Sequence, residues 1–184
     1  MITLDELYPL PPADPRLFAN RLRSQLAGTG VAIQQFRSDA LDADDEAKDM
    51  ARVVTLRGMS ACALGLGPNG HVAFNEPGVP FDAGARFVPF TDGTLAHLGG
   101  PSSVAPATGG MTLPLSTLMS ADAILLVVSG SKSVAFERLL WGELDADLPA
   151  SVLRLHSNVD VMVHTAVLGM RVDDALVLPG VHRS

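Results

Sequence analysis

The sequence predicts an α/β fold in which a parallel β-sheet is covered by helices on both faces. Short apolar runs typical of buried strands occur at 60–65, 123–128 and 159–164. Helical patterns lie between the strands, and this alternation favours a parallel sheet. With 184 residues, 47% of them hydrophobic, the chain can bury one core, and we expect a single domain over 1–184.

The first part of the chain contains two predicted helices and one predicted strand. Asp14 and Pro15 form a typical helix start, and apolar residues at four-residue spacing follow until Gly28, which can end the helix. The segment 31–36 is a strand candidate. The acid-rich segment 42–58 predicts a helix that ends at its last glycine, with its charged side chains in solvent.

The middle of the chain is less regular. After the buried strand at 60–65, the segment 86–90 is a short strand candidate, and 113–119 predicts a helix. Between them, 93–110 is rich in Gly, Pro, Ser and Ala. A loop of that length in a compact domain is either functional or mobile, and we expect a lid here.

The last part of the chain returns to alternating elements. The run at 123–128 is the strongest strand pattern in the sequence. It is followed by a predicted helix at 131–141, which ends at Gly142, and by a strand at 159–164, with 166–168 as a candidate extension.

Composition narrows the class of partner. A net charge of −7 without any Lys/Arg run argues against nucleic acid and against an anionic membrane surface, so we expect a small-molecule ligand. No apolar stretch approaches the ~20 residues that span a bilayer. The N-terminal residues are acidic, unlike a signal peptide, so we expect a cytoplasmic protein. Cys62, inside an apolar run, is expected to be a buried structural thiol.

One stretch has the composition of a site. Residues 63–78 read ALGLGPNGHVAFNEPG and follow a predicted buried strand, and ligands of α/β sheets bind at the carboxyl ends of strands. His71 and Glu76 are five positions apart. An imidazole titrates near neutrality, and a nearby carboxylate raises its basicity. The glycines let the backbone approach a ligand closely. The stretch therefore predicts a proton relay.

Two other interpretations of this stretch stay open. Residues 65–70 match the dinucleotide pattern GxGxxG, in which the third glycine begins a helix that holds a pyrophosphate. Here Pro77 and Gly78 would end such a helix after barely two turns. Alternatively, the glycines make a tight turn, and His71 and Glu76 are only a surface pair.

The stretch LGLGPNGHVAFNEPG resembles the signature G-x-G-x-D-G-H-I-A-F-N-E-P of the glucosamine-6-phosphate deaminase/isomerase family. The 6-phosphogluconolactonases share the first half of this signature but lack Phe-Asn-Glu-Pro, which is present here at 74–77. Other segments resemble the deaminase family in the same order: LDELYPLPPADPRLF (4–18), MTLPLSTLMSADAILLVVSGSKSVAF (111–136) and ASVLRLH (150–156).

The resemblance implies a Rossmann-like sandwich and a specific reaction. The family opens the sugar ring, moves a proton between C2 and C1 of an amino-sugar phosphate, and releases ammonia to leave fructose 6-phosphate, with no metal or organic cofactor. By matched position, Asp5 would be the C2 base and His71 the ring-opening acid and base. Glu76 would orient His71 and support its charged form.

The resemblance also implies substrate-binding residues. Gly67 and Gly70 belong to the signature, and Lys132 follows the strongest strand at a turn into a helix, where a cation and free backbone amides suit a phosphate. The alternative for Lys132 is a surface residue in the first turn of that helix. Glu6, next to Asp5, is either a helper or simply exposed.

Three departures from the family pattern matter. The family has aspartate where this chain has Asn69, which belongs to the candidate catalytic group because an amide can orient a neighbour, although it cannot carry charge or accept a proton. We therefore expect a less basic His71. The family's first strand and Gly-Ser/Thr phosphate loop precede its Asp-Glu pair, and we expect both to be missing here. Finally, 92–103 contains no arginine where the family binds phosphate.

Two further residues near that region have open roles. His97 could substitute for the absent arginine or be incidental, and Arg86 could contact substrate or be a surface charge. The leading hypothesis is an amino-sugar phosphate deaminase/isomerase. The alternatives are a catalytically reduced sugar-phosphate binder or sensor, and a lactonase-like hydrolase in which His71 activates water. Since relatives often form oligomers, a homo-oligomer is an open expectation.

Overall fold

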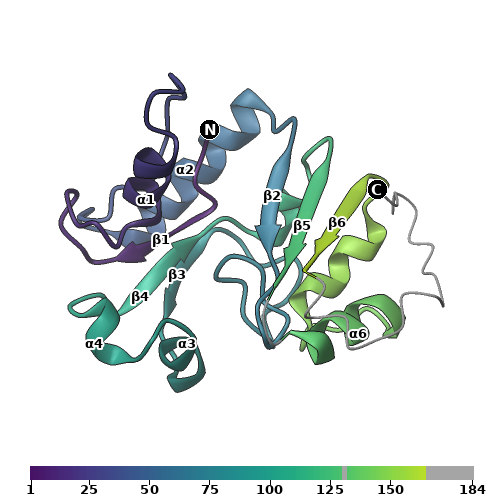
Figure 1. Ribbon diagram of the computed structural model, residues 1–184. Coiled ribbons are helices and arrows are strands. Elements are labelled where there is room, and N and C mark those ends of the chain that lie inside the picture. The colour runs from purple at the N-terminus through teal and green to yellow at the C-terminus, as the bar shows by residue number, and fades with distance from the viewer. Residues whose placement is uncertain (130–131, 165–184) are drawn as a thin grey trace. The chain divides into compact units, whose positions relative to one another are not determined.

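The computed structural model describes residues 1–129 and 132–164 (Figure 1). These residues divide into two compact units. The first contains Met1–Leu56 and Gly84–Leu113, and the second contains Arg57–Ala83 and the chain from Pro114 onward. Each unit has its own three-stranded sheet. The expectation of a single domain over 1–184 stays a prediction.

The second unit contains the predicted parallel sheet. Its strands are β2 (Cys62–Gly65), β5 (Ile124–Val128) and β6 (Val159–Val163), in the order β2-β5-β6. All pairs are parallel. Its helices are α5 (Leu115–Leu118), α6 (Ser133–Trp141) and the 3₁₀ helix η1 (Pro149–Leu155). Alternate β5 residues are fully buried, and α6 buries the apolar side that faces the core. The predicted α/β class is confirmed.

The first unit contains an antiparallel sheet that the sequence did not predict. Its strands are β1 (Asp5–Tyr8), β4 (Gly109–Thr112) and β3 (Arg86–Pro89), in the order β1-β4-β3. Tyr8 and Phe87 meet edge to face across the central strand, with ring centroids 5.7 Å apart. The residue between them on the central strand is Gly109. A larger side chain at this position would collide with the Phe87 ring.

The helices of the first unit differ partly from prediction. Helix α1 spans Phe18–Gln25 rather than beginning at Asp14. Residues 15–17 form a turn, in which the Leu17 N–H donates to the Asp14 carbonyl at 3.2 Å and the Asp14 carboxylate accepts the backbone and side-chain N–H groups of Arg16. Helix α2 spans Ala43–Arg57 and ends before Gly58, which has a φ of 73°, as predicted. Most of its charged side chains are exposed, although Glu46 is buried and bonded to Arg37.

Two predictions for the first unit were wrong. The segment 31–36 forms no strand and makes one isolated bridge, from Gln34 to Ile2. The segment 93–110 is not a long loop, because it contains most of helix α3 (Asp92–His97), helix α4 (Pro101–Val104) and the start of β4. Thr91 caps α3 by accepting the Thr94 N–H at 3.1 Å. The segment is therefore ordered structure, and its interpretation as a lid stays a prediction.

The remaining predicted elements lie close to their expected bounds. Helix α6 ends at Gly142, as predicted. Residue 131, where the helix was expected to begin, and the candidate strand extension at 166–168 both lie outside the described residues. Cys62 is a buried free thiol, as predicted. Among the described residues no helix is both long and apolar enough to cross a bilayer.

Candidate functional site

The signature loop, residues 66–79, begins at the carboxyl end of β2. The Leu66 N–H still donates to the Val127 carbonyl at 3.1 Å, which continues the pairing with β5. The chain then reverses, because the Gly67 N–H donates to the His71 carbonyl at 2.9 Å and the Gly70 N–H donates to the Gly67 carbonyl at 3.0 Å. This tight turn holds His71 next to the strand end.

At two positions of this loop, the structure explains why the residue is a glycine. A Cβ at Gly67 would collide with the His71 imidazole, so the ring packs directly on the backbone there. Gly70 has a φ of 88°, and a Cβ there would meet the side chain of the buried Leu148. These contacts fix the position of His71. Substrate contacts by the two glycines stay a prediction.

Asn69 bridges His71 and Glu76. Its Nδ2 donates to the Glu76 Oε2 at 2.9 Å, and its Oδ1 accepts the His71 backbone N–H at 3.2 Å. These two contacts orient the amide, because the reverse orientation would place an NH₂ against an N–H and an oxygen against a carboxylate. The His71 Nδ1 lies 2.6 Å from the same Oδ1, and since that oxygen can only accept, Nδ1 must carry the proton.

Glu76 acts on His71 at slightly longer range. The Glu76 Oε2 lies 3.8 Å from the His71 Nδ1, beyond hydrogen-bond length but within ion-pair length if the ring is protonated. The two side chains are only 13% and 14% exposed, so the field of the carboxylate is weakly screened. Asn69, rather than Glu76, is therefore the immediate orienting partner of the His71 ring.

A second segment, residues 145–151, supports the signature loop from outside it. The Gly78 N–H donates to the Ala146 carbonyl and the Ala150 N–H donates to the Gly70 carbonyl, both at 2.9 Å. Leu148, only 1% exposed, packs against Gly70. The sequence did not predict this support, since only the short resemblance at 150–156 pointed to the region.

Lys132 lies at the same edge of the parallel sheet as the signature loop. It precedes α6 after β5, and because β2 and β5 are parallel neighbours, the loops that follow them leave the same edge. Lys132 is half-buried, and burial lowers its pKa. Within the described residues it has no recorded ion-pair or hydrogen-bond partner through its ammonium group. This arrangement suits an anionic ligand group.

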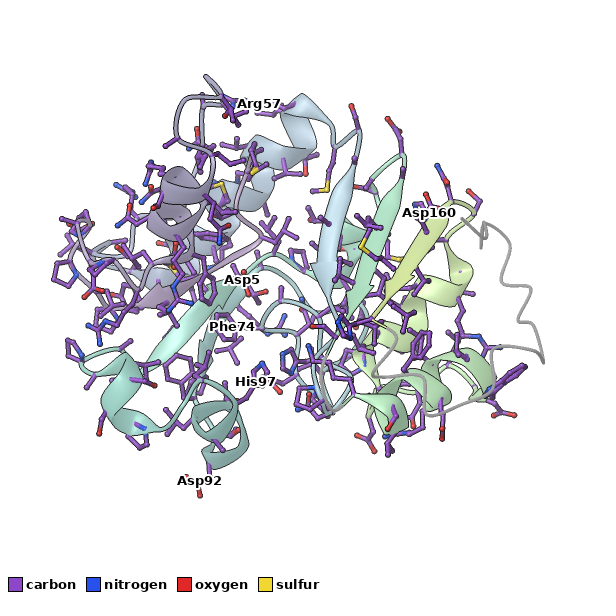
Figure 2. The ribbon with its side chains drawn as sticks, in the orientation of Figure 1. Asp5, Arg57, Phe74, Asp92, His97 and Asp160 are labelled. Atoms are coloured by element: carbon purple, nitrogen blue, oxygen red, sulfur yellow. The ribbon has the colours of Figure 1, made fainter. Side chains whose placement is uncertain are left out.

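Asp5 and Glu6 are the first two residues of β1, in the first unit. Figure 2 labels Asp5. Asp5 is half-buried, and burial together with the neighbouring charge of Glu6 raises its pKa to about 7. Glu6 is fully buried. Its carboxylate accepts the N–H groups of Leu7, Phe18 and Ala19 at 3.0, 2.8 and 2.9 Å. The alternative that Glu6 is simply exposed is wrong.

Arg86 lies in the same row of the antiparallel sheet as Asp5. Both residues pair with Thr112 on the central strand, so all three side chains leave the same face. Arg86 is half-buried, its Nη1 donates to the Gly84 carbonyl at 2.9 Å, and burial lowers its pKa while Asp44 opposes that change. His97 ends α3 (Figure 2). Whether either residue contacts substrate stays open.

No cluster of His, Cys, Asp and Glu in the described residues could hold a metal ion. The side-chain chemistry present is that of proton transfer: an oriented imidazole in the second unit and a carboxyl of raised pKa in the first.

Comparison with known proteins shows which family the chain belongs to. No family model matches the chain. A glucosamine-6-phosphate deaminase from Streptococcus thermophilus is 30% identical over 171 residues, which are 90% of this chain and 73% of that protein. The chain belongs to the glucosamine-6-phosphate deaminase family. A Bacillus cereus deaminase is 31% identical over 176 residues, and the chain spans 66% of the length of that relative.

Solved structures similar to this chain include a member of the deaminase family. A monomeric glucosamine-6-phosphate deaminase is 28% identical with a TM-score of 0.83, and the match covers 92% of this chain and 74% of that one. A 6-phosphogluconolactonase from Thermotoga maritima is 18% identical with a TM-score of 0.66, covering 88% and 71%. The lactonase shares the fold. The Rossmann-like class expected for the deaminase family is thus confirmed.

Proposed function

We propose that the chain is an enzyme that converts glucosamine 6-phosphate and water to fructose 6-phosphate and ammonia. The observation that carries this proposal is the Asn69–His71–Glu76 cluster at the carboxyl end of β2, inside the signature of the deaminase family. An oriented imidazole beside a weakly screened carboxylate can both accept and return a proton near neutral pH.

His71 opens the sugar ring. Because its Nδ1 donates to Asn69, its Nε2 has the lone pair and can take the proton of the anomeric hydroxyl. As the bond between C1 and the ring oxygen breaks, the same nitrogen returns the proton to that oxygen, which leaves an open-chain amino aldehyde. Glu76 stabilises the imidazolium that exists between the two transfers.

Asp5 moves the proton between the two carbons. It takes the C2 proton, and the electrons of that bond form a C1–C2 double bond while the aldehyde oxygen takes a proton from the substrate's own ammonium group, which becomes an amine. Asp5 then gives the proton to C1, and the nitrogen becomes an iminium at C2. Water adds to C2 and ammonia leaves, which gives the ketose. A carboxyl whose pKa is about 7 suits a group that accepts and returns a proton at neutral pH.

Lys132 binds the phosphate. Its half-buried ammonium lies before the first turn of α6, where backbone N–H groups precede the first intrahelical bond, from the Phe136 N–H to the Lys132 carbonyl. Gly67 and Gly70 complete the substrate side of the signature loop. A cytoplasmic location, the absence of cofactors and nucleic-acid partners, and a homo-oligomer stay predictions from sequence.

A second candidate function is a sugar-phosphate binder without turnover. Asn69 favours it, because an amide replaces the carboxylate that the family has at this position and cannot stabilise the imidazolium by charge. The lactonase alternative has less support, since the lactonase relatives share the fold at 18% identity or less and the chain carries the Phe-Asn-Glu-Pro part of the deaminase signature.

Product analysis distinguishes the three functions. Purified protein is incubated separately with glucosamine 6-phosphate and 6-phosphogluconolactone, and binding of the amino sugar is measured by calorimetry. The proposal predicts ammonia and fructose 6-phosphate in equal amounts from the first substrate only. Binding without ammonia supports the binder, and hydrolysis of the lactone alone supports the lactonase.

A further inference from the structure

Glu6 is the most deeply buried charged side chain of the first unit, and no step of the proposed reaction uses it. Its side chain reaches from β1 to the start of α1, where both of its oxygens accept backbone N–H groups of Phe18 and Ala19. The N-cap residue of that helix is Leu17, whose apolar side chain provides no capping hydrogen bond. Glu6 therefore caps α1 from a neighbouring strand.

The hydrogen bonds of Glu6 favour its ionised form. Three N–H donors point at its two oxygens, and Arg21 of α1 adds a favourable charge. Burial opposes ionisation and raises the Glu6 pKa above its ordinary value. Because every recorded contact is a donor to the carboxylate, the geometry selects the anion at neutral pH.

Asp5 precedes Glu6 on β1, so a buried anion lies one residue from the proposed base. The other charged group in the same sheet row is Arg86, on β3, and Asp44 of α2 lies near that arginine. Burial and the charge of Glu6 both make the proton of Asp5 harder to lose. Because consecutive side chains of a strand leave opposite faces, the two carboxyl groups interact across β1 through their charges.

We propose that Glu6 is a positioning residue for Asp5: bound to the N-terminal amides of α1, it fixes β1 against that helix and places a buried carboxylate one residue from the base, on the opposite face of the strand. This inference rests on the proposed function only for the use of Asp5 in catalysis. Burial alone would still raise the pKa of Asp5, and the charge of Glu6 raises it further, which makes the Asp5 carboxylate a stronger base.

The test is a carboxyl ¹³C NMR titration of the whole chain, which needs no enzyme activity. In the wild type, Glu6 should titrate below Asp5. Glu6→Gln keeps the shape but removes the charge, and should lower the Asp5 midpoint by about one pH unit. Glu6→Asp keeps the charge but is one methylene too short to reach α1, so the protein should lose stability while the Asp5 midpoint stays high.

Tyr8→Phe is the matched control, because it removes another tertiary hydrogen bond of β1, from Tyr8 to the Ala40 carbonyl, without changing charge. It should leave the Asp5 midpoint unchanged. An unchanged midpoint in Glu6→Gln overturns the inference. If that variant does not fold, a wild-type Glu6 that titrates above Asp5 overturns it equally.

The pH dependence of ammonia release separates this inference from the proposed function. Both predict that the acidic limb of the rate profile moves down with the Asp5 midpoint in Glu6→Gln. If the NMR midpoint moves and the limb does not, the coupling of Glu6 to Asp5 stands, and Asp5 is not the base.

Discussion

At the scale of single residues, Asn69 determines what the His71 imidazole can do. Its amide oxygen only accepts, so the proton of the ring stays on Nδ1 and the lone pair on Nε2. An aspartate here would also accept, but it would add a negative charge beside the ring. The amide therefore keeps the tautomer that the family reaction needs and gives up part of the electrostatic support for the imidazolium.

The tautomer of His71 gives the first prediction. We expect ¹⁵N NMR to find the wild-type ring protonated at Nδ1, and Asn69→Ala to introduce the Nε2-protonated form, because the acceptor 2.6 Å from Nδ1 is gone. Asn69→Asp should raise the His71 midpoint by about one pH unit through its charge. A wild-type ring protonated mainly at Nε2 would contradict the assigned amide orientation.

The close packing of the His71 ring on Gly67 gives a second prediction. Gly67→Ala should displace the ring, cost about 1–3 kcal/mol of unfolding free energy and abolish ammonia release. Gly65→Ala, two residues earlier, is the control, since a Cβ there meets no atom within 4 Å. Equal losses in the two variants, measured by urea denaturation and activity, would refute a specific contact at position 67.

Burial of Asp5 gives a prediction about pH and stability. Its pKa is about 7 in the folded chain, against a reference value of 3.8, so only the folded state holds the proton between these values. The contribution of Asp5 to the free energy of unfolding therefore falls as pH rises from 3.8 to 7. Asp5→Asn should raise Tm relative to wild type at pH 8, by on the order of 5 °C. This gain should be clearly smaller at pH 4, and a gain independent of pH would exclude a buried, protonated Asp5.

At the scale of elements, the sequence predicted those strands and helices whose buried residues form a local pattern, either a continuous apolar run or a periodic one. Strand β5 is an unbroken apolar run, and α2 has periodic apolar positions and a glycine beyond its end. Strand β4 reads Gly-Gly-Met-Thr, which has little strand character, yet it is fully buried because it pairs with β1, about a hundred residues earlier, and with β3. Such non-local pairing overrides local propensity.

The candidate site was predictable to the same extent. The signature loop could be read from its own residues and its place after a strand, whereas the bridge through Asn69 depends on which way an amide points. The burial of Glu6 could not be read either, because its partners are backbone N–H groups of α1, twelve and thirteen residues away. Sequence pattern carries no direct signal for contacts to backbone.

The support segment gives a prediction at this scale. Leu148→Ala should open a cavity beneath Gly70 and cost about 2–5 kcal/mol of unfolding free energy, while broadening the His71 ring signals as the loop loses its support. Leu155→Ala, at the end of the 3₁₀ helix that Leu148 precedes, is 65% exposed and should change stability by about 0.5 kcal/mol or less. Sharp, unshifted His71 signals in Leu148→Ala would show that the segment does not position the loop.

At the scale of the whole molecule, the chemistry is divided between two compact units. The Asn69–His71–Glu76 cluster and Lys132 belong to the second unit, and Asp5 and Glu6 belong to the first. The proposed reaction has two proton transfers, ring opening by His71 and carbon-to-carbon transfer by Asp5. Because each step needs its own group, loss of either His71 or Asp5 should stop ammonia release.

The most direct measurement is the steady-state rate of ammonia release from glucosamine 6-phosphate by wild type and His71→Ala, with His156→Ala as a second histidine of the same unit whose ring nitrogens bond to Ala121 and Asn158. We predict turnover by wild type and by His156→Ala, and a loss of about 10²-fold or more in His71→Ala. Ammonia release by His71→Ala at the wild-type rate, or none by the folded wild-type protein, would contradict the account.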